Sequence, residues 1–446
     1  MNSHPLAHLL PDSATFSAQG ILHIARHSVP ELAEKYGTPL YVFDRATIVN
    51  ACQRYQQTFA RHYTASPVRF LYASKAYLSP LIARMMAEQD MGLDVVSGGE
   101  LQVALLANFP VERIAFHGNN KSLEELRLAL QVGAGHIVLD NWSELEQLTS
   151  LARAAGQQSA VLLRVAPDVQ TDTHRYLQTG HAASKFGFAL GNGEAKAAIK
   201  CILTEGRLRL VGLHAHNGTM LRETRPYEEC IERLFALAFE IYEEVGWWPQ
   251  EISPGGGWAV DAPGVDVLAR ALQASMERQL RTHDSGLAAP TLVIEPGRSI
   301  IARAGVAVYR IGARKQTAGG ITFLFVDGGM GDNIRPALYG AQYSALAVER
   351  AFAPPEETVC VAGRYCESGD ILIEQIRLPR MRDGELLALL VAGAYSLPMS
   401  SNYNFVPRPA VILVDEDGAQ LMERRETVDD LLRRYPAFDE RAGSAS

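Results

Sequence analysis

A strand, a helix and a second strand are encoded in residues 69–96, which read RFLYASKAYLSPLIARMMAEQDMGLDVV. Arg69–Ala73 and Gly92–Val96 are short apolar runs, as expected of buried strands. Between them Ser79 precedes Pro80, and a capping residue followed by proline is typical of the start of a helix. This order is a β/α unit, in which the two strands run parallel.

The same alternation continues from about Tyr41 to Arg298, and Ser122 with Glu125 predicts another helix start through a capping box. We count eight strand-like runs: Arg69–Ala73, Gly92–Val96, Arg113–Phe116, His136–Leu139, Ala160–Val165, Leu208–Ala215, Gln250–Ile252 and Leu292–Ile294. We therefore predict an α/β fold, a (β/α)8 barrel over residues 41–300.

After Arg298 the pattern changes to strands separated by turns. The predicted strands are Val306–Ile311, Ile321–Val326, Glu357–Val361, Ile371–Leu378, Leu386–Val391 and Ala410–Val414, with a hairpin from Asp417-Gly418 into Leu421–Arg424. A further strand-like piece, Gly20–Ile24, lies near the start of the chain. We predict a second, mainly β domain formed by residues 1–40 and 301–446.

Composition favours a folded protein with a small-molecule ligand. The 446 residues are 47% hydrophobic and 21% charged, which suits one large domain and a smaller one. A net charge of -8 without a long Lys or Arg run argues against nucleic acid and anionic membranes. The longest apolar runs are too short to span a bilayer, and five cysteines without a C-x-x-C pair suggest reduced thiols. We expect a cytoplasmic protein.

Polar and reactive residues gather where the predicted barrel strands end. They are Lys75 after the first strand, Asp94 on the second, His117 on the third, His216 and Thr219 after the sixth, Gly255, Gly256 and Gly257 after the seventh, and Glu295, Gly297 and Arg298 after the eighth. Because the carboxyl ends of barrel strands form one face, these residues are predicted to share one active site.

The residues at this face suggest both an anion-binding site and a nucleophilic amine. Three adjacent glycines, Gly255–Gly257, would let backbone N–H groups approach a phosphate. The same three residues are also typical of a flexible loop without a ligand. Thr219 adds a hydroxyl, or is an ordinary turn residue. Lys75 ends an apolar strand, where desolvation would favour its use as a nucleophile over a solvated surface role.

Two histidines and a glutamate suggest an aromatic cofactor. His214 and His216 lie two residues apart, so they share a face of one strand. They could be buried core histidines, two ligands of a metal site, or a site at which an imidazole stacks on the ring of an aromatic cofactor. Without a carboxylate or thiol at ligand spacing we predict no metal. Glu295 needs a cationic partner if buried, and a protonated pyridine nitrogen would serve. Arg298 could clamp a phosphate or carboxylate, or form a surface salt bridge.

The sequence resembles the diaminopimelate decarboxylase family of barrel-type, fold type III, pyridoxal 5'-phosphate (PLP) dependent amino-acid decarboxylases. The resemblance covers nearly the whole chain and rests on Tyr72–Ala76, Gly92–Glu100, Ser184–Gly187, Glu295–Arg298, Ile334–Tyr339, Cys366–Asp370, Gly393–Tyr395 and Met399–Asn404.

This resemblance implies a role for each cofactor residue. Lys75 would hold PLP as a Schiff base, Glu295 would keep the pyridine nitrogen protonated, and His216 would stack on the ring. The implied cofactor-binding set also contains Asp94, Thr219, Gly255, Gly256, Gly257, Gly297, Arg298 and Tyr395. Cys366 from a neighbouring subunit would reprotonate the product, so a homodimer with a shared site is expected.

The resemblance further implies conversion of meso-diaminopimelate to L-lysine and CO2 in lysine biosynthesis. The substrate-binding residues would be Arg298, Arg335, Tyr339, Glu367 and Tyr395. Arginines and a tyrosine suit the distal carboxylate, and a glutamate suits the distal ammonium.

Departures from the usual family sequence leave a related substrate open. The family usually reads His-Ile-Gly-Ser-Gln where this chain has His216–Met220, and the family's usual glycine after the Gly255–Gly257 loop is replaced within Trp258-Ala259-Val260. Asn217, Met220 and Trp258 would alter the pocket wall, and the alternative substrate would then be an ornithine- or lysine-like amino acid or a secondary-metabolism intermediate.

Two further interpretations are weaker. An amino-acid racemase would share the barrel-plus-β architecture, but the Cys366–Asp370 motif argues against it. An inactive regulatory binder of the same family would not need both Lys75 and Cys366, and this chain retains the two residues.

Overall fold

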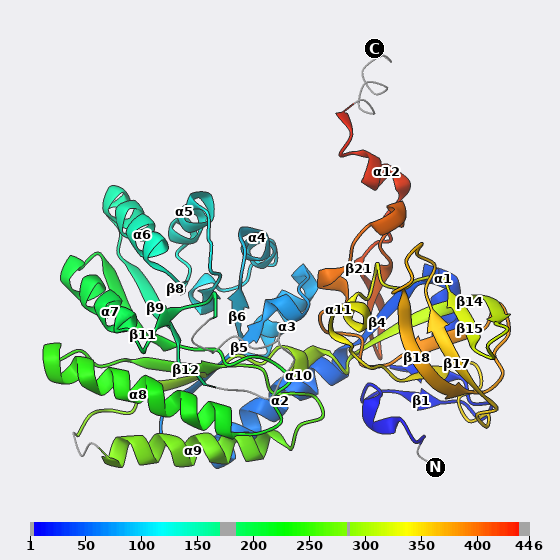
Figure 1. Ribbon diagram of the computed structural model, residues 1–446, viewed down its shortest axis with the longest axis horizontal. Coiled ribbons are helices and arrows are strands. Elements are labelled where there is room, and N and C mark those ends of the chain that lie inside the picture. The colour runs from blue at the N-terminus through cyan, green and yellow to red at the C-terminus, as the bar shows by residue number, and fades with distance from the viewer. Residues whose placement is uncertain (1–3, 170–183, 283–285, 437–446) are drawn as a thin grey trace. The chain divides into compact units, whose positions relative to one another are not determined.

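The computed structural model describes residues 4–169, 184–282 and 286–436. Contacts divide the chain into two compact units, one of residues 49–300 and one of residues 1–48 with 301–446 (Figure 1). The first is built on a barrel and the second on antiparallel and mixed sheets.

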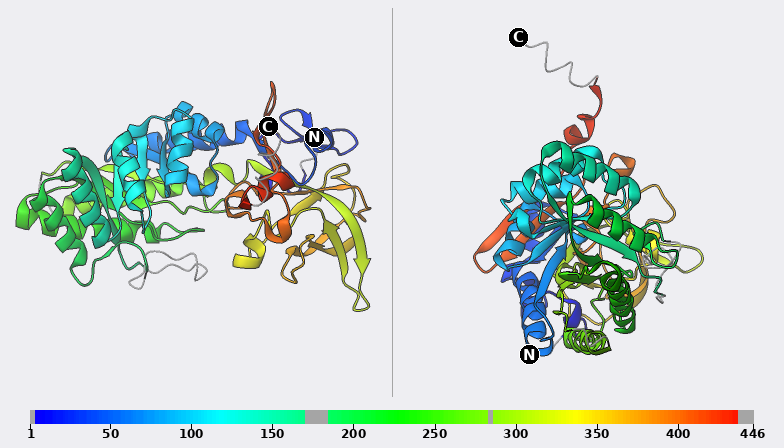
Figure 2. Two further views of the ribbon diagram at one scale, coloured as in Figure 1. Left: turned by 90° about the horizontal axis from the view of Figure 1, so that it is seen from above. Right: turned by 90° about the vertical axis from the view of Figure 1, so that its left-hand side faces the viewer.

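The barrel consists of eight parallel strands. They are β5 (Val68–Ala73), β6 (Gly92–Val95), β7 (Ile114–Phe116), β8 (His136–Leu139), β9 (Ser159–Ala166), β11 (Leu208–His214), β12 (Glu251–Gly255) and β13 (Thr291–Ile294). Pairing of β13 with β5 and of β8 with β9 closes the ring, which Figure 2 shows end-on in its right-hand view. The short β10 (Phe188–Ala189) pairs with β9. The predicted (β/α)8 barrel is confirmed, with every strand near its predicted position.

Helices surround the strands (Figure 1). They are α2 (Arg45–His62), α3 (Pro80–Glu88), α4 (Gly98–Leu106), α5 (Leu123–Val132), α6 (Trp142–Ala155), α7 (Glu194–Glu205), α8 (Arg225–Val245), α9 (Val265–Thr282) and the short α10 (Arg298–Ile301). Both predicted helix starts are confirmed: the Ser79 side chain accepts a hydrogen bond from Ile82 N, and Ser122 with Glu125 forms a complete capping box.

An apolar plug fills the middle of the barrel. It takes one buried residue from each of six strands: Leu71, Ala115, Val138, Leu162, Val211 and Val293. Residues of opposite strands meet only inside the ring, so this cluster closes the interior. Polar side chains at the carboxyl ends of the strands therefore lie above a sealed floor, and a ligand reaches them from that end.

The second unit contains a nine-stranded sheet and a three-stranded sheet. The large sheet runs β18 (Ile371–Leu378), β17 (Glu357–Ala362), β15 (Thr322–Val326), β14 (Gly305–Gln316), β4 (Leu40–Asp44), β20 (Ala410–Asp415) and β21 (Gly418–Glu423), with β16 (Ala345–Ala347) and β19 (Leu386–Leu389) paired beside β14. The small sheet is β1 (Thr15–Phe16), β2 (Leu22–Ile24) and β3 (His27–Ser28), followed by α1 (Val29–Tyr36). Two short helices, α11 (Arg335–Tyr339) and α12 (Val428–Leu432), complete it.

The amino-terminal segment packs into this unit. Leu22 and Ile24 of β2 share one core with Val42 of β4 and Ile412 of β20. Leu22 N also donates a hydrogen bond to Val348 O, 2.8 Å away. The predicted mainly β domain, formed by both ends of the chain, is therefore observed.

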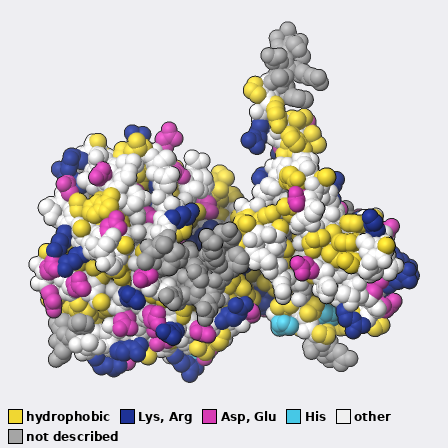
Figure 3. All heavy atoms as spheres, in the orientation of Figure 1, with side chains coloured by type: hydrophobic (Ala, Val, Ile, Leu, Met, Phe, Trp, Pro, Cys, Tyr) yellow, Lys and Arg dark blue, Asp and Glu magenta, His cyan; other side chains and the backbone are white. Residues whose placement is uncertain are grey.

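The surface carries charges of both signs. On the face of the barrel unit in Figure 3, Lys and Arg side chains alternate with Asp and Glu, so that face presents no field of one sign. No helix within the described residues has the length and apolar character needed to cross a membrane.

Candidate active site

Lys75 lies at the carboxyl end of β5, in the single helical turn Ser74–Ala76 that follows the strand. Its Nζ is 3.5 Å from Oδ2 of Asp94, which lies on β6 and whose side chain is 1% exposed. Neither Asp94 carboxylate oxygen accepts a hydrogen bond from a described residue. A buried carboxylate with spare acceptor sites beside an amine can orient that amine toward a ligand.

Glu295 follows β13 and is held by two side chains, one from β12 and one from β11. His214 Nε2 lies 3.0 Å from Glu295 Oε2, and Ser253 Oγ donates to Oε1 at 3.2 Å. Burial alone would raise the pKa of Glu295, but His214 and His117 outweigh it and place the pKa below its usual value. The buried Glu295 is therefore a carboxylate at neutral pH, in need of a cationic partner.

His117 completes a three-residue cluster with His214 and Glu295. Its Nε2 is 3.6 Å from Glu295 Oε1 and 3.8 Å from Asp94 Oδ1, and its ring meets that of His214 edge to face at 4.7 Å. Burial lowers the pKa of His117 well below its usual value, and the nearby Glu295 carboxylate opposes this shift. One ligand atom from each of His117, His214 and Glu295 lies within 4.8 Å of the others, a spacing that suits a cation or a protonated ring nitrogen. Because the three residues lie far apart in the chain, their spacing in sequence does not indicate this cluster.

His216 and the Gly255–Gly257 loop form a cradle beside this cluster. Gly256 N donates to His216 Nδ1 at 3.3 Å, which leaves Nε2 as the protonated ring nitrogen. A Cβ on Gly256 would lie 1.8 Å from Glu295 O, and one on Gly257 would lie 2.1 Å from Gly218 O. Only glycine fits these positions. Burial, then Lys75, lowers the pKa of His216 well below its usual value, so the ring is neutral.

The cradle offers donors for an anion. Within the described part of the chain, the N–H groups of Gly218 and Gly257 make no hydrogen bond. Gly218 is buried and Gly257 is half-buried, and both N–H groups are available to a ligand phosphate. The half-buried Thr219 lies in the same loop. The residues present thus fit the phosphate of PLP, and the Glu295 carboxylate fits its pyridine nitrogen.

Gly297 and Arg298 follow Glu295. A Cβ on Gly297 would lie 2.9 Å from Ala73 Cβ, so the loop can pass the end of β5 only with glycine here. Arg298 is half-buried and begins α10. The predicted barrel residues are therefore brought together by the ends of β5, β6, β11, β12 and β13.

The remaining predicted site residues belong to the β-rich unit: Arg335 and Tyr339 on α11, then Cys366, Glu367 and Tyr395 in loops. Cys366 and Glu367 are exposed, and Tyr395 has a positive φ of 62°. Cys366 is held through its backbone, whose N–H donates to Asn404 Oδ1 at 2.9 Å.

Arg335 is a buried cation without a carboxylate partner among the described residues. It is 8% exposed, its Nη1 donates to the Tyr343 hydroxyl at 2.9 Å, and its Nε has no hydrogen-bond partner there. A buried guanidinium is costly unless an anion pairs with it. Arg335 is therefore suited to receive a ligand carboxylate.

Sequence reasoning missed Ser253 and the ion pair of Arg164 with Asp140. Arg164 Nη1 is 3.4 Å from Asp140 Oδ2, and its guanidinium covers the Phe186 ring at 4.3 Å. Gly187 N donates to Asp140 Oδ1 at 3.0 Å. The motif Ser184–Gly187 was the available signal, but nothing in its spacing indicates these partners.

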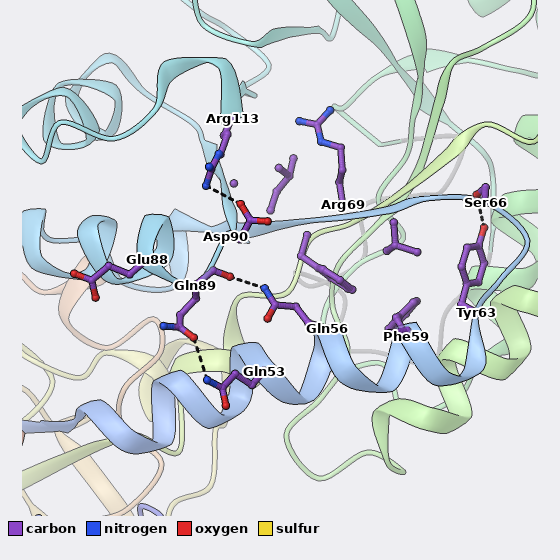
Figure 4. Close-up of a pocket in the computed structure, with 15 residues that line it drawn as sticks. Gln53, Gln56, Phe59, Tyr63, Ser66, Arg69, Glu88, Gln89, Asp90 and Arg113 are labelled. Atoms are coloured by element: carbon purple, nitrogen blue, oxygen red, sulfur yellow. Dashed lines mark hydrogen bonds and ion pairs between the residues drawn. The ribbon is translucent and has the colours of Figure 1, made fainter.

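A separate cavity of about 750 Å³ lies at the amino-terminal end of β5 and β6, beside α2 (Figure 4). Its two arginines are already paired, Arg113 with Asp90 at 3.0 Å and Arg69 with Glu251 at 2.5 Å. None of the predicted site residues lines it. The chemistry described above therefore belongs to the opposite end of the strands.

Comparisons with known proteins agree with this geometry. Residues 45–302 match the family described as "Pyridoxal-dependent decarboxylase, pyridoxal binding domain". The chain is 41% identical over 421 residues to a diaminopimelate decarboxylase of Bacillus subtilis, and the match covers 93% of this chain and 95% of the relative.

Solved structures agree as well. A diaminopimelate decarboxylase of M. jannaschi has a TM-score of 0.88 and 33% identity, covering 95% of this chain and 98% of that one. One from Helicobacter pylori, complexed with L-lysine, has a TM-score of 0.82 and 28% identity, covering 93% and 100%.

Proposed function

The chain belongs to the diaminopimelate decarboxylase family of pyridoxal-dependent decarboxylases, and on that premise we propose that it converts meso-diaminopimelate to L-lysine and CO2. The observation that carries the proposal is the convergence of Lys75, Asp94 and Glu295 at the carboxyl end of the barrel. An amine, a phosphate cradle and a fixed carboxylate are what PLP requires. The same reaction places the protein in lysine biosynthesis.

Each barrel residue then has a task. With PLP bound, Lys75 would hold the cofactor through its amine, and Glu295, fixed by His214 and Ser253, would hold a proton on the ring nitrogen. His216 supports the ring, and the cradle binds the phosphate through Gly257 and Thr219. Bound PLP supplies an electron sink for the pair of electrons left behind when CO2 departs. Asp94 orients the Lys75 amine.

The β-rich unit supplies the substrate contacts in this proposal. Arg335, with its unsatisfied Nε, binds the distal carboxylate, together with Arg298 and Tyr339. Glu367 binds the distal ammonium, and Tyr395 lies near the phosphate. The exposed Cys366 delivers a proton from Sγ to the carbon that lost CO2.

The experiment that tests the function is a substrate panel. The purified chain with PLP is given meso-diaminopimelate, L-ornithine, L-lysine and L-arginine, and each amine product is measured. We expect decarboxylation of meso-diaminopimelate to exceed that of the rest by about a hundredfold, since only that substrate pairs with Arg335. Comparable rates on ornithine would overturn the assigned substrate.

A homodimer with a shared active site is also part of the proposal, supported by the exposure of Cys366 and Glu367 within one chain. The five free cysteines suit a cytoplasmic location, which we propose with it.

Mixed subunits test the shared site. Lys75→Ala and Cys366→Ala chains are each expected to be nearly inactive alone. Refolded together, half of the chains form mixed dimers, in which one of the two sites has both residues intact, so about a quarter of the wild-type activity should return. Mixing Lys75→Ala with Cys201→Ala, a half-buried free cysteine of the barrel unit, is the matched control. No recovery in verified Lys75→Ala/Cys366→Ala dimers would show that each site is built within one chain.

A further inference from the structure

The first turn of α8 contacts both loops of the phosphate cradle. Tyr227 is 1% exposed, and its hydroxyl donates to Gly256 O at 2.9 Å. Asn217, also 1% exposed, donates from Nδ2 to Pro226 O at 2.8 Å. One side chain thus reaches from the helix to the glycine loop, and another reaches from the His216 loop to the helix.

The two loops are also joined to each other. Leu221 N donates to Gly257 O at 3.0 Å, and Ala259 N donates to Leu221 O at 3.0 Å. Trp258 is buried behind the glycine loop, with Nε1 bonded to Pro263 O at 3.1 Å and its ring 6.0 Å from that of Tyr227. These contacts place Asn217 and Trp258, two of the three departures from the usual family sequence, against α8 and the segment that follows the loop.

The Tyr227 hydrogen bond fixes the direction of a donor. Gly256 C=O and Gly257 N–H belong to one planar trans peptide, so they point in opposite directions. Because Tyr227 holds the carbonyl toward α8, the Gly257 N–H is turned away from α8. That N–H has no partner among the described residues. Glycines at φ +81° and +104° leave this backbone free to rotate unless something outside the loop restrains it.

The same peptide segment also contacts His216. The Gly256 N–H donates to His216 Nδ1 at 3.3 Å, which joins the glycine loop to the loop after β11 by a further hydrogen bond. Burial raises the pKa of Tyr227 well above its usual value, and its hydroxyl remains a donor throughout the neutral range.

We propose that Tyr227 and Asn217 are positioning residues, which fasten the cradle to α8 and so aim its N–H groups at the cofactor's phosphate. The inference deepens the proposed function and rests on it. It also gives one of the sequence departures, Asn217, a role in cofactor binding. Neither residue touches the phosphate in this account; both act through the backbone of Gly256 and the loop after β11.

The test compares PLP with pyridoxal, which lacks the phosphate. Cofactor-free wild-type protein, Tyr227→Phe and Asn217→Leu are titrated with each compound, and the dissociation constants are read from absorbance. Tyr227→Phe keeps the ring against Trp258 and removes only the hydroxyl. Tyr242→Phe, on the same helix and 36% exposed, is the matched control. Thermal midpoints of the cofactor-free proteins report on folding.

We expect each variant to bind PLP about tenfold more weakly, the effect of leaving one buried group unpaired, and to bind pyridoxal within about twofold of wild type. Tyr242→Phe should change neither constant. An equal loss for both compounds, or PLP affinity within about twofold of wild type in a folded Tyr227→Phe protein, would overturn the inference. A wild-type chain that binds no PLP would overturn the proposed function and the inference with it.

Discussion

Replacing Lys75 with alanine is expected to lower turnover by about 10³-fold or more and to abolish covalent attachment of PLP. Lys75 supplies the amine beside Asp94 at the end of β5, whereas Lys121, a buried lysine of the barrel unit, has its Nζ bonded to Glu144. Borohydride reduction followed by mass spectrometry measures the attachment. The cofactor's mass should appear on the peptide that contains Lys75 in the wild type alone.

Two further variants separate the loss of the nucleophilic amine from the loss of a positive charge. Lys75→Arg keeps a cation near Asp94 but offers no nucleophilic amine, so it should be as inactive as the alanine variant. Lys200→Ala, which removes an exposed ion pair with Glu244 on the outside of the barrel, should stay near wild-type activity. Retained turnover in Lys75→Ala, with the cofactor still attached, would refute the assignment.

Replacing Arg335 with leucine is expected to cost about 3 kcal/mol of transition-state binding for meso-diaminopimelate, roughly a hundredfold or more in kcat/KM. The reason is that the distal carboxylate would enter a buried site without a charged partner. Substrates without that carboxylate should be affected by much less than about tenfold.

The contrast between substrates excludes a general loss of folding. Arg377→Leu, an exposed arginine on β18, is the matched control and should change neither rate. If Arg335→Leu lowered the rates on all substrates equally, the residue would serve the fold and not recognition of the distal carboxylate.

The barrel was predictable because its strands are buried on both sides. Runs such as Leu208–Ala215 are mostly apolar, and capping residues such as Ser79 mark the helices between them. Closure of the strands into a ring was predicted because the sequence contains eight strand-like runs. In contrast, β4 (Leu40–Asp44) looks like a barrel strand in sequence, yet it pairs with β14 and β20. Strand partners depend on tertiary packing, which a local pattern does not contain.

The site was predictable as a location but not as a network. Strand ends indicate one face, whereas the contact between His214 and Glu295 depends on register across β11, β12 and β13. His214 aligns with Ser253, and this alignment brings both side chains to Glu295. The sequence does not contain that register in any local pattern. For the same reason the sequence did not indicate the hydrogen bond from the Asn217 side chain to Pro226 O on α8.

The most direct test of the account is the fate of labelled substrate. Purified protein with PLP is given meso-diaminopimelate labelled in its carboxyl groups, and L-lysine and labelled CO2 are quantified together. The account predicts that the two appear in equal amounts and that neither forms with the Lys75→Ala protein. If the wild-type protein bound PLP and decarboxylated another amino acid while leaving meso-diaminopimelate intact, the proposed function would be contradicted.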